Sequence, residues 1–328
     1  MIPKVSIVIP AYNRAIMLTE AVTSALKQNY PRLEVIVSDD ASTDNTKELI
    51  QQFTQDSRFR YFRNSENLGL VPNLRKVCFE YASGDWLLIL NDDDYLIDPH
   101  YVSKAMDLLS QDSEIVVIHS NCRVLVTTDR TTTDTDKSLP VIADGKWMFL
   151  NYKYAYFGNI NCSTLTVIFN RHLAMSLGCF QDDTIPISND RETWLKLLLR
   201  GKVGFLSDVS AVYRIHGGNL HRHADMNILF ANLGSILNPY EFAKLEGCFH
   251  TNELEQWKKR MIREACEIWL ISNLITCRHK ISLLSQFIRR ISIEYPFALI
   301  SVLKVFMPET LAKIVLSAFN NVIHYPEA

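Results

Sequence analysis

Three adjacent carboxylates follow a run of apolar residues near position 90. Asp92, Asp93 and Asp94 come after Asn91 and the apolar run 86–90, which is typical of a buried strand. Neighbouring carboxylates in a partly desolvated crevice raise one another's pKa values, and a divalent cation removes that conflict. Carboxylate oxygens are the ligands that Mg²⁺ and Mn²⁺ prefer. The pattern therefore favours a cation site over the alternative, a solvated acidic turn before a helix N-terminus.

Two further candidate binding positions also follow predicted strands. Asp39 and Asp40 come after the run 33–37, in a segment rich in Ser, Thr, Asp and Asn. Such residues can cap the following helix. A carboxylate at a strand end can also accept a hydrogen bond from a ribose hydroxyl or a base N–H, so both interpretations stay open. Tyr12, after the run 5–9, either stacks on a flat ring or belongs to a strand-to-helix turn.

The elements that carry these positions alternate between strand and helix patterns. Apolar runs without polar alternation predict strands at 5–9, 33–37, 59–62, 86–90 and 115–119. Helical spacing of apolar residues predicts helices near 18–26, 46–53, 72–82 and 99–110. An α/β pattern of this kind predicts a mostly parallel sheet flanked by helices on both faces, with ligands at the carboxyl ends of the strands.

The remainder of the chain is less regular. Its predicted elements are a helix at 189–200 and strands at 164–169, 203–206 and 209–214. The Thr- and Asp-rich segment 127–137 is predicted to be an exposed loop. From about 223 the pattern is helical. We therefore predict two domains, residues 1–222 around the sheet and residues 223–328 as a C-terminal helical region.

Composition narrows the function classes. The formal net charge of −2 and a pI of about 6.5 give no sign of nucleic-acid binding. The seven cysteines lack metal-ligand spacing, and we expect reduced thiols in a cytoplasmic protein. We find neither a signal-peptide pattern nor the run of roughly 20 apolar residues that a membrane helix needs. No GxGxxG or GxxxxGK[ST] motif occurs, so we expect metal rather than a glycine-rich loop to neutralise a bound diphosphate.

Taken together, these motifs resemble the family 2 glycosyltransferases, which have the nucleotide-diphospho-sugar-binding fold called GT-A. The matching segments lie in order over roughly residues 1–220: VSIVIPAYNR (5–14), VSDDASTDNT (37–46), NLGLVPNLRKVCFEYASGDWLLILNDDD (67–94), NDRETWLKLLLRG (189–201) and VYRIHGGN (212–219). The resemblance implies that residues 1–222 are a GT-A nucleotide-sugar-binding catalytic domain and that the helical region is an appendage to it.

The resemblance also implies roles for donor-binding residues. Tyr12 would pack on the base of the donor nucleotide, and Asp40 would hydrogen-bond this base, with Asp39 as the adjacent candidate. Arg75 stands where the family has an arginine near the nucleotide and its phosphates.

The acidic run covers the family's DxD motif, whose usual form is Leu-Asp-x-Asp-Asp. The resemblance therefore assigns the metal, Mn²⁺ or Mg²⁺, mainly to Asp94 and next to Asp93, while Asp92 fills the variable position. Asn91 replaces the first Asp of the motif. It can still hydrogen-bond a ribose hydroxyl, but it is a poorer metal ligand.

The family's acidic pair Glu-Asp appears here as Asn189-Asp190. Asp190 matches the general base, and one carboxylate is enough for a single displacement, whereas Asn189 departs from the pattern. His216 occupies a position that reaches the metal or the diphosphate in some relatives. The alternative is a loop histidine bonded to backbone. Trp194 is expected to pack in the core.

These roles imply an inverting, metal-dependent glycosyltransferase of the hexosyltransferase type. We expect a UDP-linked sugar donor and a hydroxyl acceptor on a glycan or lipid-linked saccharide, as in bacterial surface polysaccharide synthesis. Asp190 would take the acceptor's proton as its oxygen attacks the anomeric carbon through an oxocarbenium-like transition state. Two other functions stay open. Asn91 and Asn189 fit a non-catalytic sugar-nucleotide or glycan-binding module, and the Asp cluster fits a metal-dependent nucleotidyltransferase.

The C-terminal region is basic. Residues 256–304 hold nine Lys or Arg and three Glu, interleaved with aromatic residues. A basic amphipathic helix can lie on an anionic membrane surface, so peripheral association with the inner face of the membrane is one interpretation. A helical appendage with a solvated charged face is the other.

Overall fold

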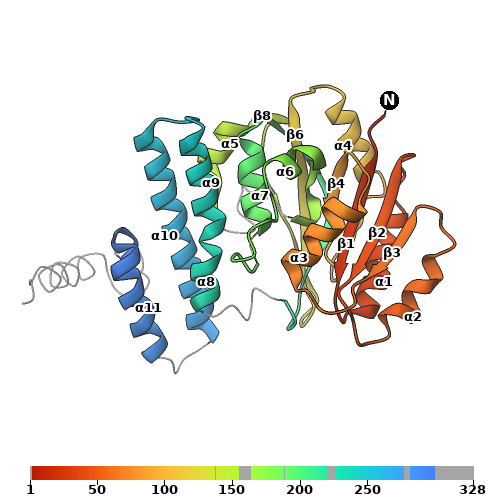
Figure 1. Cartoon of the computed structure of the whole chain (residues 1–328), viewed down its shortest axis with the longest axis horizontal. Coiled ribbons are helices and arrows are strands. Elements are labelled where there is room, and N and C mark those ends of the chain that lie inside the picture. Colours follow the sequence, from red (N-terminus) through yellow and green to blue (C-terminus); the bar gives the residue numbers. More distant parts are fainter. Residues whose placement is uncertain are drawn as a thin grey trace, which may run out of the picture. The chain divides into compact units, whose positions relative to one another are not determined.

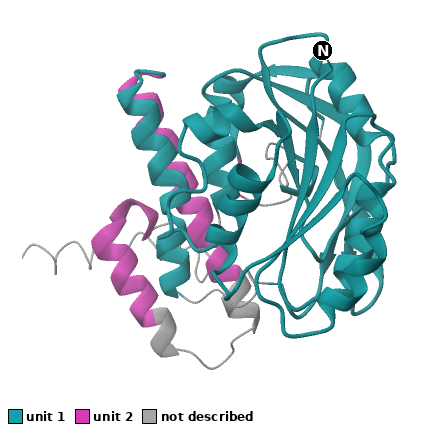
Figure 2. Ribbon diagram, turned by 45° about the vertical axis from the view of Figure 1, so that its right-hand side comes forward, with its two compact units in different colours: residues 1–152, 156–248 teal, residues 153–155, 249–328 magenta. Residues whose placement is uncertain are grey.

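The chain divides into two compact units, which are described separately (Figure 2). Unit 1 comprises residues 1–152 and 156–248, and unit 2 comprises residues 153–155 and 249–328. The computed structural model describes residues 2–136, 138–154, 164–187, 189–219, 226–276 and 281–299.

A mixed sheet forms the centre of unit 1 (Figure 1). Its strands within the described residues are β1 (Val5–Ala11), β2 (Leu33–Asp39), β3 (Phe59–Arg63), β4 (Trp86–Ile89), β5 (Tyr95–Leu96), β6 (Ile115–Val126), β7 (Thr131–Asp134), β8 (Ile142–Asp144), β9 (Ile168–Asn170) and β10 (Lys202–Ile215). They follow the order β3-β2-β1-β4-β9-β6-β10-β5, with β7 beside β6 and β8 beside β10.

The first half of the sheet is parallel, as the apolar runs predicted. β1 pairs in parallel with β2 and with β4, and β2 pairs in parallel with β3. Val8 lies opposite Ile36 on one side and Ile89 on the other, and every residue of β1 is buried. Because both faces of these strands are covered, the runs need no polar alternation. The predicted α/β fold is confirmed.

Beyond β4 the sheet is mixed. β9 pairs antiparallel with both β4 and β6, whereas β6 and β10 pair in parallel. The strands predicted at 203–206 and 209–214 form one strand, β10, whose register shifts between Leu206 and Ala211. Such irregularities leave residues unpaired and bend a strand. Residues 207–208 are exposed at this point, which is why the apolar pattern breaks there.

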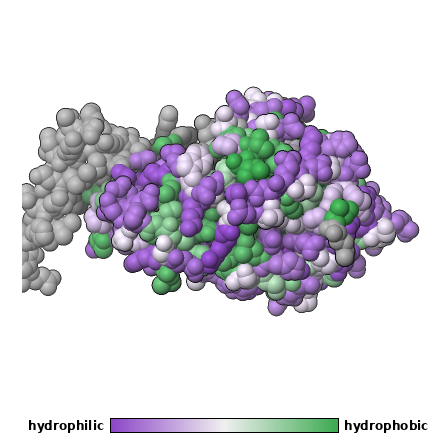
Figure 3. Space-filling view, turned by 90° about the horizontal axis from the view of Figure 1, so that it is seen from above, coloured by the Kyte–Doolittle hydropathy of each residue, from purple (hydrophilic) through white to green (hydrophobic). Residues whose placement is uncertain are grey.

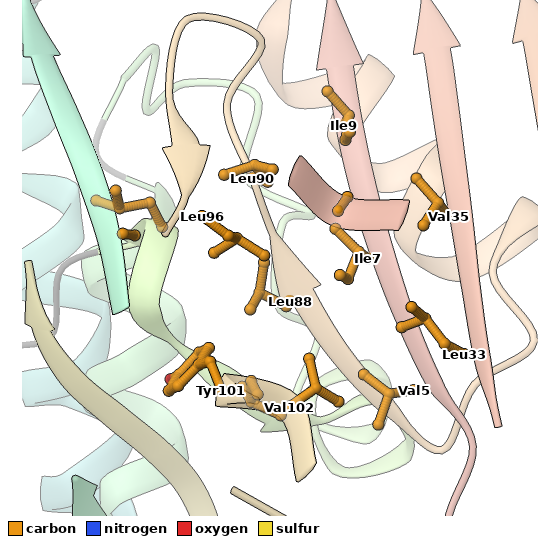
Figure 4. Close-up of a cluster of buried hydrophobic side chains, with 14 of the residues drawn as sticks. Val5, Ile7, Ile9, Leu33, Val35, Leu88, Leu90, Leu96, Tyr101 and Val102 are labelled. Atoms are coloured by element: carbon orange, nitrogen blue, oxygen red, sulfur yellow. The ribbon is translucent and has the colours of Figure 1, made fainter. Parts of the chain in front are cut away.

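Helices cover both faces of the sheet. Those of unit 1 within the described residues are α1 (Ala15–Leu26), α2 (Thr46–Ile50), α3 (Leu70–Arg75, continued by a π-helical segment, Lys76–Tyr81), α4 (Tyr101–Leu109), α5 (Gly145–Asn151), α6 (Arg171–Ser176), α7 (Asn189–Leu198), α8 (Met226–Asn232) and α9 (Gly234–Leu245). Figure 4 shows part of the core on one face, where Ile7 of β1 and Leu88 of β4 lie near Tyr101 and Val102 of α4.

Strand β9 shows which helices lie on which face. Ile168 belongs to the core cluster that α1 and α4 cover, whereas Phe169 packs edge-on against Trp194 of α7 with ring centroids 5.0 Å apart. Successive strand residues point to opposite faces, so α7 lies on the face opposite α1 and α4. Trp194 is fully buried, which confirms its predicted place in the core.

The exposed loop predicted at 127–137 is wrong in part. Thr131–Asp134 form β7, which pairs antiparallel with β6, although all four of its residues are exposed. A strand of Thr and Asp has no apolar face, so the hydrophobic pattern gave no signal for it.

Unit 2 is helical in its described part. It contains α10 (Thr251–Thr276), α11 (Ile281–Glu294) and a short 3₁₀ turn, Pro296–Ala298. Trp269 and Phe287 are buried and stack with ring centroids 4.6 Å apart. The sequence pattern placed a domain boundary after residue 222, whereas the compact units divide after residue 248, so that α8 and α9 lie in unit 1.

No helix in the described ranges is both long enough and apolar enough to cross a membrane. On the face shown in Figure 3, hydrophobic residues form separate patches among hydrophilic ones.

Candidate active site

The acidic turn (residues 92–94) follows β4 and contacts two other strand ends. Asp92 accepts hydrogen bonds from the backbone N–H of Tyr12 (3.0 Å) and from the guanidinium of Arg14 (2.8 Å). Asp93 Oδ2 lies 3.0 Å from Nε2 of His216. The turn therefore joins the carboxyl ends of β1, β4 and β10, where ligands bind in sheets of this kind.

Asp94 faces the backbone of β10. It is fully buried and accepts from the backbone N–H of Arg214 (2.8 Å) and from the amide of Asn91 (2.9 Å). Burial raises the pKa of Asp94 well above its usual range, and the charge of Asp93 raises it further. Burial also raises the pKa of Asp92, to about 6. Carboxylates that resist ionisation in this way gain free energy when a cation binds beside them.

The loop after β10 presents His216 to the acidic turn. The backbone N–H of Gly218 donates to Nδ1 of His216 (3.1 Å), so the neutral ring carries its proton on Nε2, toward Asp93. Asn219 is buried and clamps the loop. It accepts from the backbone N–H of His216 (2.6 Å) and donates to the carbonyl of Arg214 (3.1 Å). His216 therefore makes both a backbone contact and a carboxylate contact.

Sequence reasoning gave no role to Arg14 or Asn219. The second terminal nitrogen of Arg14 donates to the carbonyl of Gly218 (2.8 Å), which links the end of β1 to the loop after β10. Both residues lie inside the quoted motifs, next to Tyr12 and near His216. Their place in those motifs was the signal that could have found them.

The carboxylates after β2 are bonded inside the protein. Asp39 is fully buried and accepts from the hydroxyl of Tyr61 (2.5 Å) and from the guanidinium of Arg63 (2.9 Å). Asp40 accepts from two backbone N–H groups of the turn 68–69 (2.9 Å each). Asp40 thus connects the turn before α3 to the end of β2. Contact of Asp39 or Asp40 with the base of a nucleotide stays a prediction.

Tyr12 stands on two interlocked turns. Asn13 and Ala41 have positive φ angles of 53° and 60°. Asn13 Oδ1 accepts from the backbone N–H of Thr43 (2.7 Å), and its own N–H donates to the hydroxyl of Ser42 (2.9 Å). Non-glycine residues in this region are strained, and such strain clusters at functional sites. The turn leaves Tyr12 43% exposed, and its stacking on a flat ring stays a prediction.

Asp190 is half-buried at the start of α7. It accepts from the hydroxyl of Thr164 and from the backbone N–H of Arg191 (2.8 Å). The charge of Asp190 and the charges of the acidic turn both act on Tyr213 of β10. Burial raises the pKa of Tyr213, and the charges of Asp94, Asp93 and Asp190 raise it further.

Comparison with known proteins decides the family. The model of glycosyl transferase family 2 matches residues 6–176. The chain belongs to this family. The match covers both turns around Tyr12 and the whole acidic turn, and it confirms the resemblance noted in the sequence.

Two relatives of this glycosyltransferase have named activities. It is 30% identical over 217 residues to UDP-Glc:alpha-D-GlcNAc-diphosphoundecaprenol beta-1,3-glucosyltransferase WfaP of Escherichia coli, over 66% of this chain and 79% of WfaP. It is 36% identical over 126 residues to GalNAc(5)-diNAcBac-PP-undecaprenol beta-1,3-glucosyltransferase of Campylobacter jejuni. That match covers 37% of this chain and 39% of the relative, so the chain spans well under two thirds of the second protein.

Solved structures share the fold. Residues 1–349 of TarS from Staphylococcus aureus, in complex with UDP-GlcNAc, match with a TM-score of 0.66 and 15% identity over 98% of this chain and 93% of that one. The mannosyltransferase PcManGT from Pyrobaculum calidifontis, in complex with GDP-Man and Mn²⁺, matches with a TM-score of 0.54 and 15% identity over 99% and 89%. At identities this low, the structural matches show the fold alone. They confirm the predicted GT-A class.

Arg75 of the glycosyltransferase contacts the segment that leads to α7. Its Nε donates to the carbonyl of Phe180 (2.9 Å), and its guanidinium pairs with Asp183. The Asp183 side chain is 60% exposed, so water screens this pair. Among the described hydrogen bonds and ion pairs, Arg75 contacts Phe180 and Asp183 and no predicted site residue, and its approach to phosphates stays a prediction.

Asn189 lies in the interior beside Asp190. Its amide donates to the carbonyl of Ile185, and no described residue pairs with its Oδ1. This side chain is buried and Asp190 is half-buried, so Asp190 is the more exposed member of the pair.

The residues present fit a divalent cation only in part. Within the described ranges, no group of three His, Cys, Asp or Glu side chains forms a ready-made metal site. Asp93 and His216 supply two donors whose nearest atoms are 3.0 Å apart. Mg²⁺ is commonly held by one or two carboxylates, with waters and substrate phosphates completing its shell. The donor set therefore fits a cation that binds together with a diphosphate, and the assignment of Asp94 as first ligand stays a prediction.

Proposed function

We propose that this glycosyltransferase transfers a sugar from a UDP-sugar to a hydroxyl of a glycan or lipid-linked saccharide, with inversion at the anomeric carbon. The proposal depends on the separation of its carboxylates into the acidic turn, residues 92–94, and Asp190 on α7. The acidic turn follows β4 and lies beside His216, whereas Asp190 belongs to another element, the first turn of α7. The first set suits a cation and a diphosphate, and the second suits an acceptor hydroxyl.

Asp190 is held in place to act as a base. The hydroxyl of Thr164 and the backbone N–H of Arg191 orient its two oxygens. As the acceptor oxygen bonds to the anomeric carbon, the bond from that carbon to the diphosphate oxygen breaks on the opposite face. The acceptor proton moves to Asp190. One base and one displacement invert the centre through an oxocarbenium-like transition state.

Asp93, Asp94 and His216 would hold Mn²⁺ or Mg²⁺ during this reaction. A bound cation supplies neutralisation of the charge that develops on the leaving diphosphate. Asn91 and Asp92 orient the turn, through Asp94 and through Arg14 respectively.

The UDP part of the proposal has two supports. WfaP is named for a UDP-Glc donor, and TarS has been solved with UDP-GlcNAc. In this chain the exposed ring of Tyr12 and the carboxylates of Asp39 and Asp40 lie at neighbouring strand ends of β1 and β2. We propose that Tyr12 and Asp40 bind the uracil base of the donor. The donor's phosphates would then lie within reach of Arg75.

The acceptor class is supported by the names of the two relatives, both of which specify an undecaprenol diphosphate carrier. Such an acceptor implies a role in surface polysaccharide synthesis and work at the inner face of a membrane. Free thiols at the described cysteines fit the reducing conditions of the cytoplasm.

The basic residues of unit 2 are partly neutralised by glutamates of the same helices. Three basic residues pair with glutamates one helical turn away, which lowers the charge available for an anionic surface: Lys258–Glu255, Arg260–Glu264 and Arg290–Glu294. Arg278, Lys280 and Lys304, which the basic count included, lie outside the described residues. Failure of the full chain to co-sediment with anionic liposomes at low salt would exclude a purely electrostatic attachment.

The decisive experiment is a thermal-shift screen of nucleotide sugars with Mn²⁺ or Mg²⁺. We expect one UDP-sugar to raise the Tm, and the same sugar to give UDP and an inverted linkage, seen by NMR, when an acceptor is present. Release of pyrophosphate would instead indicate a nucleotidyltransferase. Binding without any release would indicate a sugar-nucleotide-binding module. If no nucleotide sugar shifts the Tm, the proposed function is wrong.

A further inference from the structure

The guanidinium of Arg14 lies among the carboxylates of the acidic turn. Its NH1 is 2.8 Å from Oδ1 of Asp92 and 3.6 Å from Oδ2 of Asp93. Its NH2 donates to the carbonyl of Gly218 at 2.8 Å. Only 25% of the Arg14 side chain is exposed, so these contacts are shielded from water on most sides.

These contacts close a ring of four residues. Arg14 donates to the carbonyl of Gly218, whose own N–H donates to Nδ1 of His216 (3.1 Å). The Nε2 of His216 meets Asp93 (3.0 Å), and Asp93 faces Arg14 again. The planar fork of an arginine can donate to a carboxylate and to a carbonyl at once, which a lysine ammonium cannot do with the same geometry.

Arg14 also balances the charge of the turn. Burial lowers the pKa of Arg14, but the charges of Asp92 and Asp93 outweigh it and raise this pKa above its ordinary value. Arg14 is therefore charged at every relevant pH. Within the described part of the chain, it is the only permanent cation in contact with these two carboxylates.

We propose that Arg14 is the resident counter-ion of the acidic turn, and that it opposes binding of a divalent cation until a nucleoside diphosphate draws its guanidinium away. This inference rests on the proposed function. A cation held by Asp93 and His216 would sit within a few ångströms of the guanidinium, where like charges repel. A diphosphate offers Arg14 a stronger, bidentate partner, and this exchange frees Asp93 for the cation.

Cation and nucleotide should therefore bind cooperatively. In the absence of a diphosphate, the carboxylates already have a counter-ion, and a second cation gains little. With a diphosphate, Arg14 pairs with phosphate and the repulsion falls. By linkage, the cation must then tighten nucleotide binding by the same factor as the nucleotide tightens cation binding.

Manganese binding to the full chain tests this without any turnover. Free Mn²⁺ is measured by its EPR signal in titrations of the wild type with and without UDP. We expect weak binding alone and binding at least about tenfold tighter with UDP, a coupling within the usual range for linked sites.

Neutral variants of Arg14 separate the counter-ion role from a structural one. In Arg14→Met, Mn²⁺ alone should bind at least about fivefold tighter than in the wild type, because one positive charge next to the site is gone. Arg14→Gln is a second neutral variant, kept in case the first does not fold, and it should behave alike. Arg14→Lys keeps the charge and should bind Mn²⁺ alone as weakly as the wild type. Arg123→Met is the control, since Arg123 of β6 pairs with Asp134 of the neighbouring strand β7 and 43% of its side chain is exposed.

Each outcome decides something. Equal Mn²⁺ affinity of the wild type and both folded neutral variants, with UDP still enhancing binding in the wild type, overturns the counter-ion role and leaves the proposed function standing. No Mn²⁺ binding by any protein under any condition removes the metal from the proposed function and this inference with it. The inference is supported if Mn²⁺ without UDP binds more tightly to Arg14→Met and Arg14→Gln than to the wild type, while Arg14→Lys and Arg123→Met bind it as the wild type does.

Discussion

The imidazole of His216 meets the carboxylate of Asp93 across 3.0 Å, although the two residues lie 123 positions apart in the chain. The contact joins the loop after β10 to the turn after β4. It places a nitrogen donor beside a carboxylate at the carboxyl edge of the sheet, which is the arrangement on which the proposed cation site depends.

Asp190→Asn should lower kcat by about 10²–10⁴-fold, the usual contribution of a positioned general base. The amide oxygen can accept from the backbone N–H of Arg191 while the amide NH₂ donates to the hydroxyl of Thr164, but the amide cannot take a proton. Steady-state kinetics with the donor found in the screen measure the effect. The Tm and the donor-induced thermal shift should stay close to those of the wild type.

The matched control for the base is Asp208→Asn, because Asp208 is exposed and pairs only with Lys104 in the described contacts. It should leave kcat unchanged. An Asp190→Asn protein with near-normal turnover would refute the base assignment.

Asp94→Asn should stabilise the protein without metal while abolishing its thermal response to Mn²⁺ and donor. Burial and the charge of Asp93 raise the folded-state pKa of Asp94. Because the pKa is raised in the folded state, the contribution of Asp94 to the free energy of unfolding is highest at low pH and falls as the pH rises toward the folded-state pKa. At pH 8 asparagine, which carries no charge, should therefore give a more stable protein than aspartate. We expect the Tm at pH 8 to rise by at least about 2 °C, the effect of roughly 1 kcal/mol in a chain of this size.

The Asn91 side chain can turn its carbonyl toward the new amide, so the hydrogen bond between positions 91 and 94 survives this substitution. A variant that is less stable at pH 8, yet still responds to Mn²⁺ as the wild type does, would show that Asp94 is structural.

Glu34→Gln should destabilise unit 1 in a pH-dependent way. Burial by itself raises the pKa of Glu34, but hydrogen bonds from Ser6, Ser83 and Lys4 outweigh it and lower the pKa to about 2. A lowered pKa contributes stability that is complete above the ordinary value of 4.5 and is lost as pH falls toward 2. Urea unfolding should show a cost of about 3 kcal/mol at pH 7.

The cost of Glu34→Gln should be visibly smaller at pH 3.5 than at pH 7. Glu114→Gln is the control, because Glu114 pairs with Lys202 on the surface with 68% of its side chain exposed. It should change stability little at either pH. A pH-independent cost at position 34 would mean that packing, not charge, explains the effect.

Ala41→Gly should stabilise the protein by up to about 1 kcal/mol, because residue 41 has a φ of 60°, a region in which an L side chain is strained. Thermal unfolding measures the change. The same substitution at Ala82, where φ is −71°, should destabilise instead. A loss of stability at position 41 equal to that at position 82 would show that the strain is absent.

Much of the fold could be predicted because its signal is local. The strands β1, β2 and β4 are short apolar runs buried on both faces, and burial of such runs does not depend on which partner covers them. The short strands β5, β7 and β8 could not be found, since they have few residues or no apolar face and form only because a neighbouring strand is present.

The sequence by itself determined the strand-end carboxylates and the family, because residue type and order along the chain are enough to recognise a motif. Only the tertiary structure decided which carboxylate faces which partner. Asp93 faces His216, Asp94 faces the backbone of β10, and Arg14 reaches a carbonyl 204 residues away. The physical reason is that side-chain partners depend on how the ends of distant strands meet, and no local pattern records which residues the sheet brings together there.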